Sequence, residues 1–179
     1  DQFEAKDPLP WEDAVARVTD ANVESIRFEG NILDTLECHY SPEMIQWIAA
    51  CAIYPSLHWD LTLYLGQQLS TKETNLLSLS NLMSLNRLPW FVEGKIPDQV
   101  RLQLLELLPD HQERELRKKL YDIFLESPPP QANSVAFDEY KMHLILNEML
   151  LSDDPQRKEE LEREYAQYLA AGYPTDFAV

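Results

Sequence analysis

The sequence predicts a mostly α-helical chain of short helices with one small β-hairpin or wing, and three observations lead to this fold class. Apolar residues recur at helical spacing in one segment after another. Most of the twelve prolines fall where a helix would begin or end. A Trp-Phe-Val run lies between prolines and a glycine in residues 89–97, which favours a short strand or hairpin over a helix.

The first elements are a short helix and a segment of open assignment. Pro10 precedes Trp11-Glu12-Asp13, and acids in a first turn interact favourably with the helix dipole, so we expect a helix to about Asp20. Residues 22–28 alternate imperfectly and are compatible with either a strand or an extended linker.

The central block has clearer signals. Ser41 is an N-cap candidate followed by Pro42, which opens a helix that continues to Pro55. A second helix is expected over residues 57–69. Ser70 and Glu73 have the spacing of a capping box, which would open a Leu-rich, buried helix ending near residue 85.

Beyond the Trp-Phe-Val run the helical pattern resumes from Asp98 to residue 108. Asp110 and Glu113 are expected to cap the next helix, which continues to Phe124. Ser127-Pro128-Pro129-Pro130-Gln131 predicts a stiff linker.

Two further helices are expected after that linker. The first covers residues 137–151, and the second is capped by Asp154 and ended by Gly172. The predicted organisation is an N-terminal helix and linker (1–40), a helical core (41–126), a Pro-rich linker (127–133) and a helical C-terminal extension (134–179).

Charge excludes one class of function. The chain has 15 Lys and Arg against 31 Asp and Glu, a formal net charge of −16 at pH 7. Nucleic acids and anionic membranes are bound through cationic side chains, so we expect neither as a direct partner. No apolar run approaches the length of a membrane span.

No catalytic, cofactor or metal motif is present, so we expect a non-enzymatic protein without a cofactor. The lone histidines do not form a metal-binding pattern: His39, His58, His111 and His143. Cys38 and Cys51 are expected to be buried free thiols in a reducing, cytoplasmic compartment. An enzyme of unfamiliar type would need a concave site lined by His111, His143 or Cys51.

Aromatic residues concentrate in the central block, where a hydrophobic core is the usual explanation. Trp90 and Phe91 allow another interpretation, because a hairpin tip cannot easily bury both of its faces and exposed aromatic pairs anchor interfaces. With the neighbouring acids Glu93 and Asp98, they are the candidate partner-binding residues.

The order of elements carries a resemblance. A helix ending in Tyr54-Pro55 is followed by a helix with Trp59 and Leu65, a Leu-rich helix, the turn-strand at residues 89–97, and a further helix. Over about residues 41–108 this resembles a winged-helix module, and it is similar to the winged helix of NB-ARC-type signal-transduction ATPases. The resemblance implies a winged-helix-like central block within a bacterial signalling or defence protein.

The expected function follows from the resemblance and the charge. A DNA-reading winged helix presents basic or amide side chains from its third helix, whereas the Leu-rich helix here offers mainly Ser, Thr and Asn on an acidic chain. We therefore expect a protein-protein interaction or regulatory domain with a basic protein partner.

The start at Asp1, without an initiator Met, indicates a piece of a larger protein. The alternative is an acidic adaptor or proteolytic substrate that sequesters a basic transcription or nuclease component.

Overall fold

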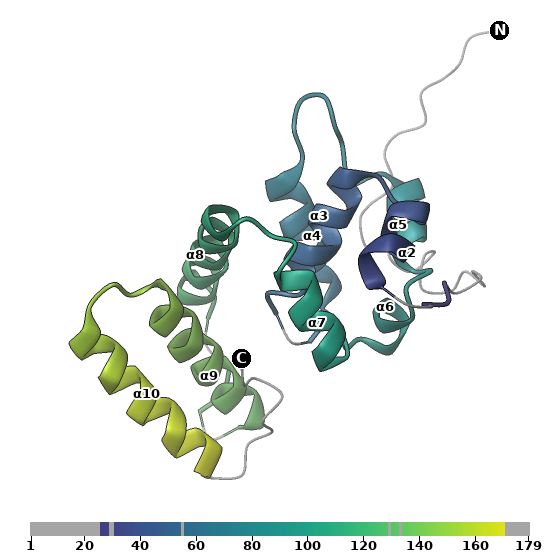
Figure 1. Cartoon of the computed structure of the whole chain (residues 1–179). Helices are drawn as coiled ribbons and strands as arrows, with labels where there is room; N and C mark the ends of the chain where they lie inside the picture. The colour runs from purple at the N-terminus through teal and green to yellow at the C-terminus, as the bar shows by residue number, and fades with distance from the viewer. Residues whose placement is uncertain (1–25, 29–30, 55, 129, 133, 171–179) are drawn as a thin grey trace, which may run out of the picture. The chain divides into compact units, whose positions relative to one another are not determined.

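The computed structural model describes residues 26–28, 31–54, 56–128, 130–132 and 134–170, and over these ranges the chain is mostly helical (Figure 1). It divides into two compact units, residues 1–107 and residues 108–179. The helices of the first unit are α2 (Ile32–His39), α3 (Pro42–Cys51), α4 (Trp59–Leu69), α5 (Leu79–Leu85), α6 (Pro89–Glu93) and α7 (Asp98–Leu105). Those of the second unit are α8 (Asp110–Glu126), α9 (Val135–Leu151) and α10 (Pro155–Ala170).

Some of the predicted features lie outside these ranges. The expected helix up to Asp20, most of the segment 22–28 and the expected stop at Gly172 are not among the described residues. The boundary between the compact units falls in the connection between α7 and α8, whereas the expected Pro-rich linker lies inside the second unit, between α8 and α9. The domain boundaries drawn from the sequence stay a prediction.

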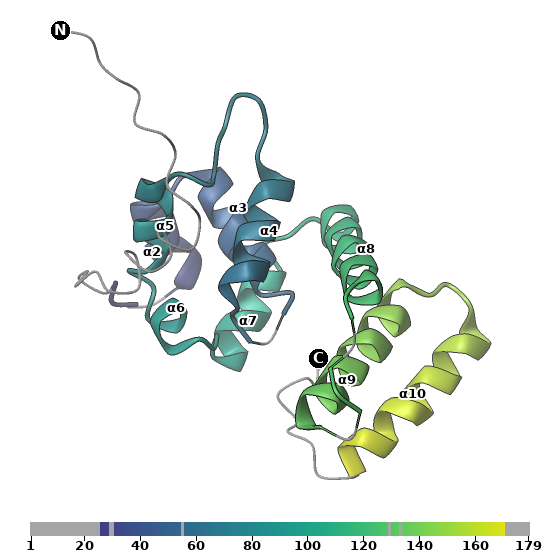
Figure 2. The same ribbon diagram turned by 180° about the vertical axis from the view of Figure 1, so that it is seen from behind.

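Helix α3 is the centre of the first unit. It packs against α2, α4 and α7, and Figures 1 and 2 show it beside α4 from both sides. The side chains from Trp47 to Cys51 are all buried. The helix begins as predicted, because Ser41 Oγ accepts a hydrogen bond from the Met44 amide at 3.3 Å and Pro42 stands in the first turn.

Helix α4, also predicted, lies against the Trp47 indole of α3. The indole Nε1 donates a hydrogen bond to the Thr62 carbonyl oxygen at 2.8 Å. One turn later, Gly66 allows the ring to approach the helix backbone: a Cβ atom on this residue would lie 2.6 Å from Trp47 Cζ2. Glycine is therefore required here by close packing.

The predicted capping box at Ser70 and Glu73 is wrong. Ser70 ends α4 rather than opening a helix: its hydroxyl donates to the Gly66 carbonyl at 2.8 Å and accepts from the Leu76 amide at 3.1 Å. The next helix, α5, begins only at Leu79, with Ser78 as its N-cap. Hydroxyl groups that bond to nearby backbone compete with helix formation, which explains the irregular segment from Ser70 to Ser78.

The predicted β-hairpin or wing is also wrong. Residues 89–93 form the short helix α6, with Pro89 in its first turn and Gly94 as a left-handed C-cap at φ +75°. Among the described residues, β pairing is limited to one isolated antiparallel bridge between Ser56 and Lys95. No strand or sheet is formed by the described part of the chain, so the mostly α part of the predicted fold class stands without its β element.

In the second unit, α9 packs against both α8 and α10 (Figure 2). Asp154 caps α10 as predicted, since its Oδ1 accepts a hydrogen bond from the Gln156 amide at 3.0 Å. The predicted cap pair at Asp110 and Glu113 is wrong, because α8 follows Pro109 without a side-chain cap. Glu113 instead forms an ion pair of 2.7 Å with Arg117, one turn along the same helix.

Candidate interaction groove

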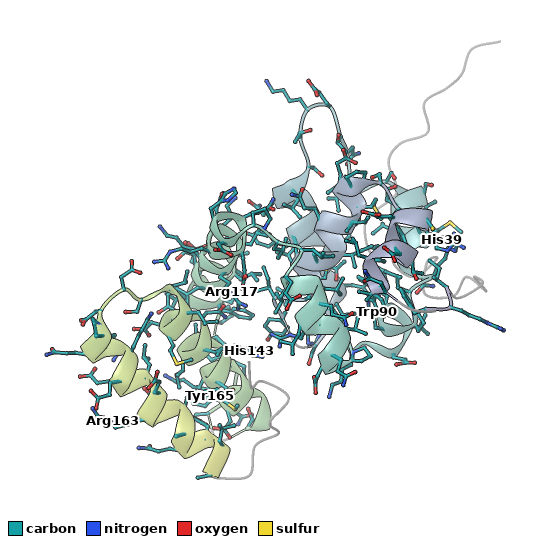
Figure 3. The ribbon with its side chains drawn as sticks, in the orientation of Figure 1. His39, Trp90, Arg117, His143, Arg163 and Tyr165 are labelled. Atoms are coloured by element: carbon teal, nitrogen blue, oxygen red, sulfur yellow. The ribbon has the colours of Figure 1, made fainter. Side chains whose placement is uncertain are left out.

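The two aromatic residues predicted to bind a partner belong to the core of the first unit. Trp90 is 3% exposed and stacks on Phe28, with ring centroids 4.9 Å apart. Phe91 is 6% exposed and its ring lies 5.9 Å from that of Trp59. Figure 3 shows Trp90 among the side chains of this unit. The expectation that a hairpin tip exposes both rings is therefore wrong.

The acidic members of that predicted set are exposed at neighbouring helix ends. Glu93 is the last residue of α6 and Asp98 the first residue of α7. Partner binding by the four predicted residues stays a prediction, and only these two carboxylates present accessible side chains for it.

The two cysteines lie in opposite environments. Cys51 is 2% exposed within α3, and burial raises the pKa of its thiol to about 12. Cys38 is exposed in the last turn of α2, so the expectation that both thiols are buried is correct only for Cys51. A buried thiol held protonated is a poor nucleophile, which leaves Cys51 as a packing residue.

The histidines are dispersed, and Figure 3 shows His39 and His143 on helices of different units. His143 is buried on α9, its ring stacked on Phe124 with centroids 6.1 Å apart and an interplanar angle of 10°. His111 is exposed on α8, where it lines an open groove with Glu115 and Asp122. Within the described ranges, no three His, Cys, Asp or Glu side chains are grouped in a way that could hold a metal ion.

The groove on α8 meets the geometric condition of the enzymatic alternative, because His111 lines it together with acidic side chains. One of its two carboxylates, Glu115, forms an ion pair of 2.9 Å with Lys119, and the hydrogen bond from that lysine lowers the pKa of Glu115. A carboxylate stabilised in its ionised form by a lysine is a weaker proton acceptor for His111 or for a substrate. The enzymatic alternative stays a prediction at this site.

A second groove, which we call the α2–α3 groove, opens on the first unit and has a volume of about 470 Å³. This volume falls in the range of small-molecule pockets and of grooves that take a few anchoring side chains. Its lining combines apolar residues with two polar ones: Leu33, Glu37, Tyr40, Pro42, Ile45, Gln46 and Leu107.

Helical spacing places this lining. Leu33 and Glu37 are one turn apart on α2, and Pro42 and Ile45 are nearly one turn apart on α3. Because α2 and α3 pack against each other, their side chains form the two sides of one groove. Leu107 joins them from the segment that follows α7.

Tyr40 contributes ring surface to this groove rather than a free hydroxyl. The residue is 8% exposed, and its phenol donates a hydrogen bond to the Ser84 carbonyl oxygen at 2.7 Å. Burial of the phenol raises its pKa above the ordinary value, so the hydroxyl stays protonated and can keep donating. The groove floor is accordingly apolar, made by Tyr40 and Ile45.

Glu37 gives the groove its charge. Its side chain is exposed and makes no ion pair with any residue that the structure describes. The described residues of the first unit are acidic as well, with 5 Lys and Arg against 8 Asp and Glu. An apolar floor beside an uncompensated carboxylate is complementary to a ligand that combines an apolar anchor with a cation.

The sequence interpretation missed this groove. The spacing of Ile32, Leu33 and Leu36 is the available signal for α2, but the prediction for residues 1–40 is an N-terminal helix and linker. Pro42 predicts the start of a helix and Ile45 continues its helical pattern, but neither residue by itself indicates a groove. Leu107 is more than 60 positions away from Pro42 and from Ile45 in the sequence, so only the fold brings it to this site.

None of the helices in the described part of the chain has the length and hydropathy needed to cross a membrane. Comparison of the chain with protein-family models, with curated proteins and with solved structures gives no match.

Proposed function

We propose that this chain is a non-enzymatic protein-interaction domain that binds a basic protein partner in the cytoplasm. The observation that carries the proposal is the α2–α3 groove, where an apolar floor lies beside the carboxylate of Glu37, which forms no ion pair with the described residues. Clefts of this composition suit an apolar side chain flanked by a positive charge.

The overall charge supports a basic partner over an acidic or neutral one. With a formal net charge of −16, the chain attracts cations over distances of about a Debye length and repels anionic surfaces. Complementary charge accelerates association and disfavours wrong partners more than it adds affinity. The partner is therefore expected to bind quickly at low ionic strength and more slowly as salt is added.

A regulatory role within a larger bacterial signalling or defence protein is the biological setting that we propose. Its support is the resemblance, in the sequence order of elements over residues 41–108, to the NB-ARC winged helix; the structure has α6 where that module has its wing. In such a protein the basic partner could be another domain of the same polypeptide or a separate chain.

Two synthetic peptides of matched length test the proposal. Peptide K places Leu residues at helical spacing on one face and Lys residues beside them, and peptide E carries Glu in place of every Lys. Fluorescence anisotropy with the chain, at NaCl concentrations from about 0.05 to 0.3 M, should show binding of peptide K alone. The association rate of peptide K, measured by stopped flow, should fall roughly severalfold over the same range of NaCl concentrations.

Either of two results would contradict the proposal. One is the absence of binding by peptide K at every salt concentration. The other is equal, salt-independent binding of both peptides, because apolar contact alone would then account for the interaction and charge would have no role in partner choice.

A further inference from the structure

We infer that the α2–α3 groove takes an amphipathic α-helix of the basic partner, with apolar side chains on Leu33, Ile45 and Leu107 and a Lys or Arg on Glu37. This inference rests on the proposed function and adds the binding mode and the charged contact. It concerns the groove alone, which lies entirely within the first unit.

The backbone around the groove favours a helical occupant. A peptide bound in extended form buries its own N–H and C=O groups, and it therefore needs an unpaired strand edge to bond with. The groove is lined from α2, α3 and the segments that follow α2 and α7, and the described residues contain no strand. A helix satisfies its backbone hydrogen bonds internally and presents only side chains to such a surface.

The dimensions of the groove agree with one or two turns of a bound helix. Helix α2 has 8 residues, so its length is about 12 Å at the usual rise of an α-helix. Leu33 and Glu37 lie about 6 Å apart along it, which is the spacing of side chains at positions i and i+4 of a partner helix. A partner helix with one apolar residue and one Lys or Arg a turn apart would contact both Leu33 and Glu37.

Glu37 is the residue that determines which charge on the partner helix is preferred. The groove contains one other polar side chain, Gln46, which is neutral and has interactions of its own. The floor, from Tyr40 and Ile45, offers no charge. A cation on the partner helix therefore has one complementary group in the groove, and replacing that group should change the preferred partner charge.

The experiment uses the full chain, peptides K and E, and a third peptide in which a central residue of peptide K is replaced by Pro to prevent helix formation. The variants are Glu37→Lys and the matched control Glu126→Lys. Both replace an exposed glutamate in the last turn of a helix, where lysine is compatible with the helix dipole, but only Glu37 lines the groove.

We expect Glu37→Lys to weaken the binding of peptide K about tenfold, since the variant loses an attraction to the lysines of the peptide and gains a repulsion. Glu126→Lys should weaken this binding less than about twofold through net charge alone. Peptide E should recover binding to Glu37→Lys, and the Pro-containing peptide should bind the unmodified chain at least about tenfold more weakly than peptide K.

Each failure has a distinct meaning. Equal effects of Glu37→Lys and Glu126→Lys, with peptide K still bound by the unmodified chain, would overturn the groove assignment while leaving the proposed function standing. Full binding of the Pro-containing peptide would overturn the helical mode. Loss of binding to all peptides contradicts the proposed function itself. Sedimentation of the chain alone tests whether a second copy of the chain occupies the groove. Self-association that is abolished by Glu37→Lys would identify a second copy as the occupant and would overturn the inference of a basic partner helix.

If Glu37→Lys disturbs α2, as judged by thermal unfolding against the unmodified chain, the milder pair Glu37→Gln and Glu126→Gln replaces it. The expected order of effects is the same, with a loss of about threefold for Glu37→Gln.

Discussion

The indole nitrogen of Trp47 donates a hydrogen bond to the main-chain carbonyl oxygen of Thr62 at 2.8 Å, and this bond joins the two helices at the centre of the first unit. Both residues are buried, Trp47 completely. A buried indole without an acceptor is costly, so the bond fixes how α3 and α4 lie against each other. The same ring lies against Gly66, which makes this contact sensitive to a single methyl group.

Gly66→Ala is expected to destabilise the first unit by about 1–2 kcal/mol. The new methyl group would lie 2.6 Å from Trp47 Cζ2 and 2.8 Å from Leu77 Cδ2, and overpacking of this kind costs more than the roughly 1 kcal/mol that alanine gains in a helix. Urea unfolding followed by circular dichroism measures the change. Gly94→Ala is the comparison, since its Cβ meets nothing closer than 4.0 Å and its cost comes from the φ of +75°. Greater stability of Gly66→Ala than of the unmodified chain would contradict the packing argument.

Ser78→Ala should cost about 1 kcal/mol of stability, whereas Glu73→Ala should change it by less than about 0.5 kcal/mol. Ser78 Oγ accepts a hydrogen bond from the Asn81 amide at the start of α5. Glu73 is exposed in the irregular segment before that helix and completes no capping box. Comparison of the two urea midpoints checks this order. A larger loss of stability for Glu73→Ala would support the predicted capping box and contradict the role of Ser78 as the N-cap.

The two thiols should differ in reactivity towards a disulfide reagent at neutral pH. Cys38 is exposed, whereas Cys51 is buried with its pKa raised to about 12 by desolvation. One thiol per chain should react quickly in the native protein and two in denaturant. Cys38→Ser should remove the fast phase, and a persistent fast phase in that variant would show that Cys51 is accessible.

The pKa of Cys51 also makes stability depend on pH. Because the folded value, about 12, lies above the ordinary value of 9.0, the protonated thiol favours the folded chain, and this contribution is fully present below pH 9. It is lost as the pH rises from 9 towards 12, by at most about 1.4 kcal/mol per pH unit. The Tyr40 phenol, whose pKa is raised by burial, acts in the same direction. Urea unfolding at a series of alkaline pH values should give a shallower slope for Cys51→Ala, and an unchanged slope would assign the effect to other groups.

Two arginines that donate hydrogen bonds to helix C-termini should differ in how much they contribute to stability. Arg101 is 3% exposed, and its Nε donates to the Ala52 carbonyl at the end of α3, 2.9 Å away. Arg114 donates to the Leu151 carbonyl at 2.8 Å and forms an ion pair with Asp153, but its side chain is 48% exposed. Arg101→Met should cost about 1–3 kcal/mol because it leaves a buried carbonyl without this donor. Arg114→Met should cost below about 1 kcal/mol, and the reverse order in thermal unfolding would contradict the burial argument.

The helices that the sequence predicted well are those with complete local signals. Ser41 and Pro42 specify the start of α3, and Asp154 with Pro155 the start of α10, because cap and first-turn preferences depend only on the few residues present there. Ser70 and Glu73 had an equivalent pattern but no helix, since the Ser70 hydroxyl bonds instead to Gly66 and Leu76. Which of two competing hydrogen bonds forms is decided by packing, which a local pattern does not contain.

The segment around Trp90 shows a different ambiguity. Pro and Gly at the two ends of an apolar run are compatible with a hairpin, but Pro at a first helical position and Gly at a C-cap are also the signals of a very short helix. The helix forms here, and Trp90 and Phe91 lie buried against Phe28 and Trp59. The α2–α3 groove could not be predicted for a related reason, because Leu107 reaches it only through the tertiary fold.

Cys38 directly follows Glu37 on α2 and is the one exposed thiol of the chain. It does not line the groove, since successive residues of a helix point about 100° apart. A polarity-sensitive dye attached at this position would therefore sit at the rim of the groove without filling it. The native sequence thus contains its own attachment point for an optical reporter, and occupancy of the groove could be followed in the intact protein without an engineered cysteine.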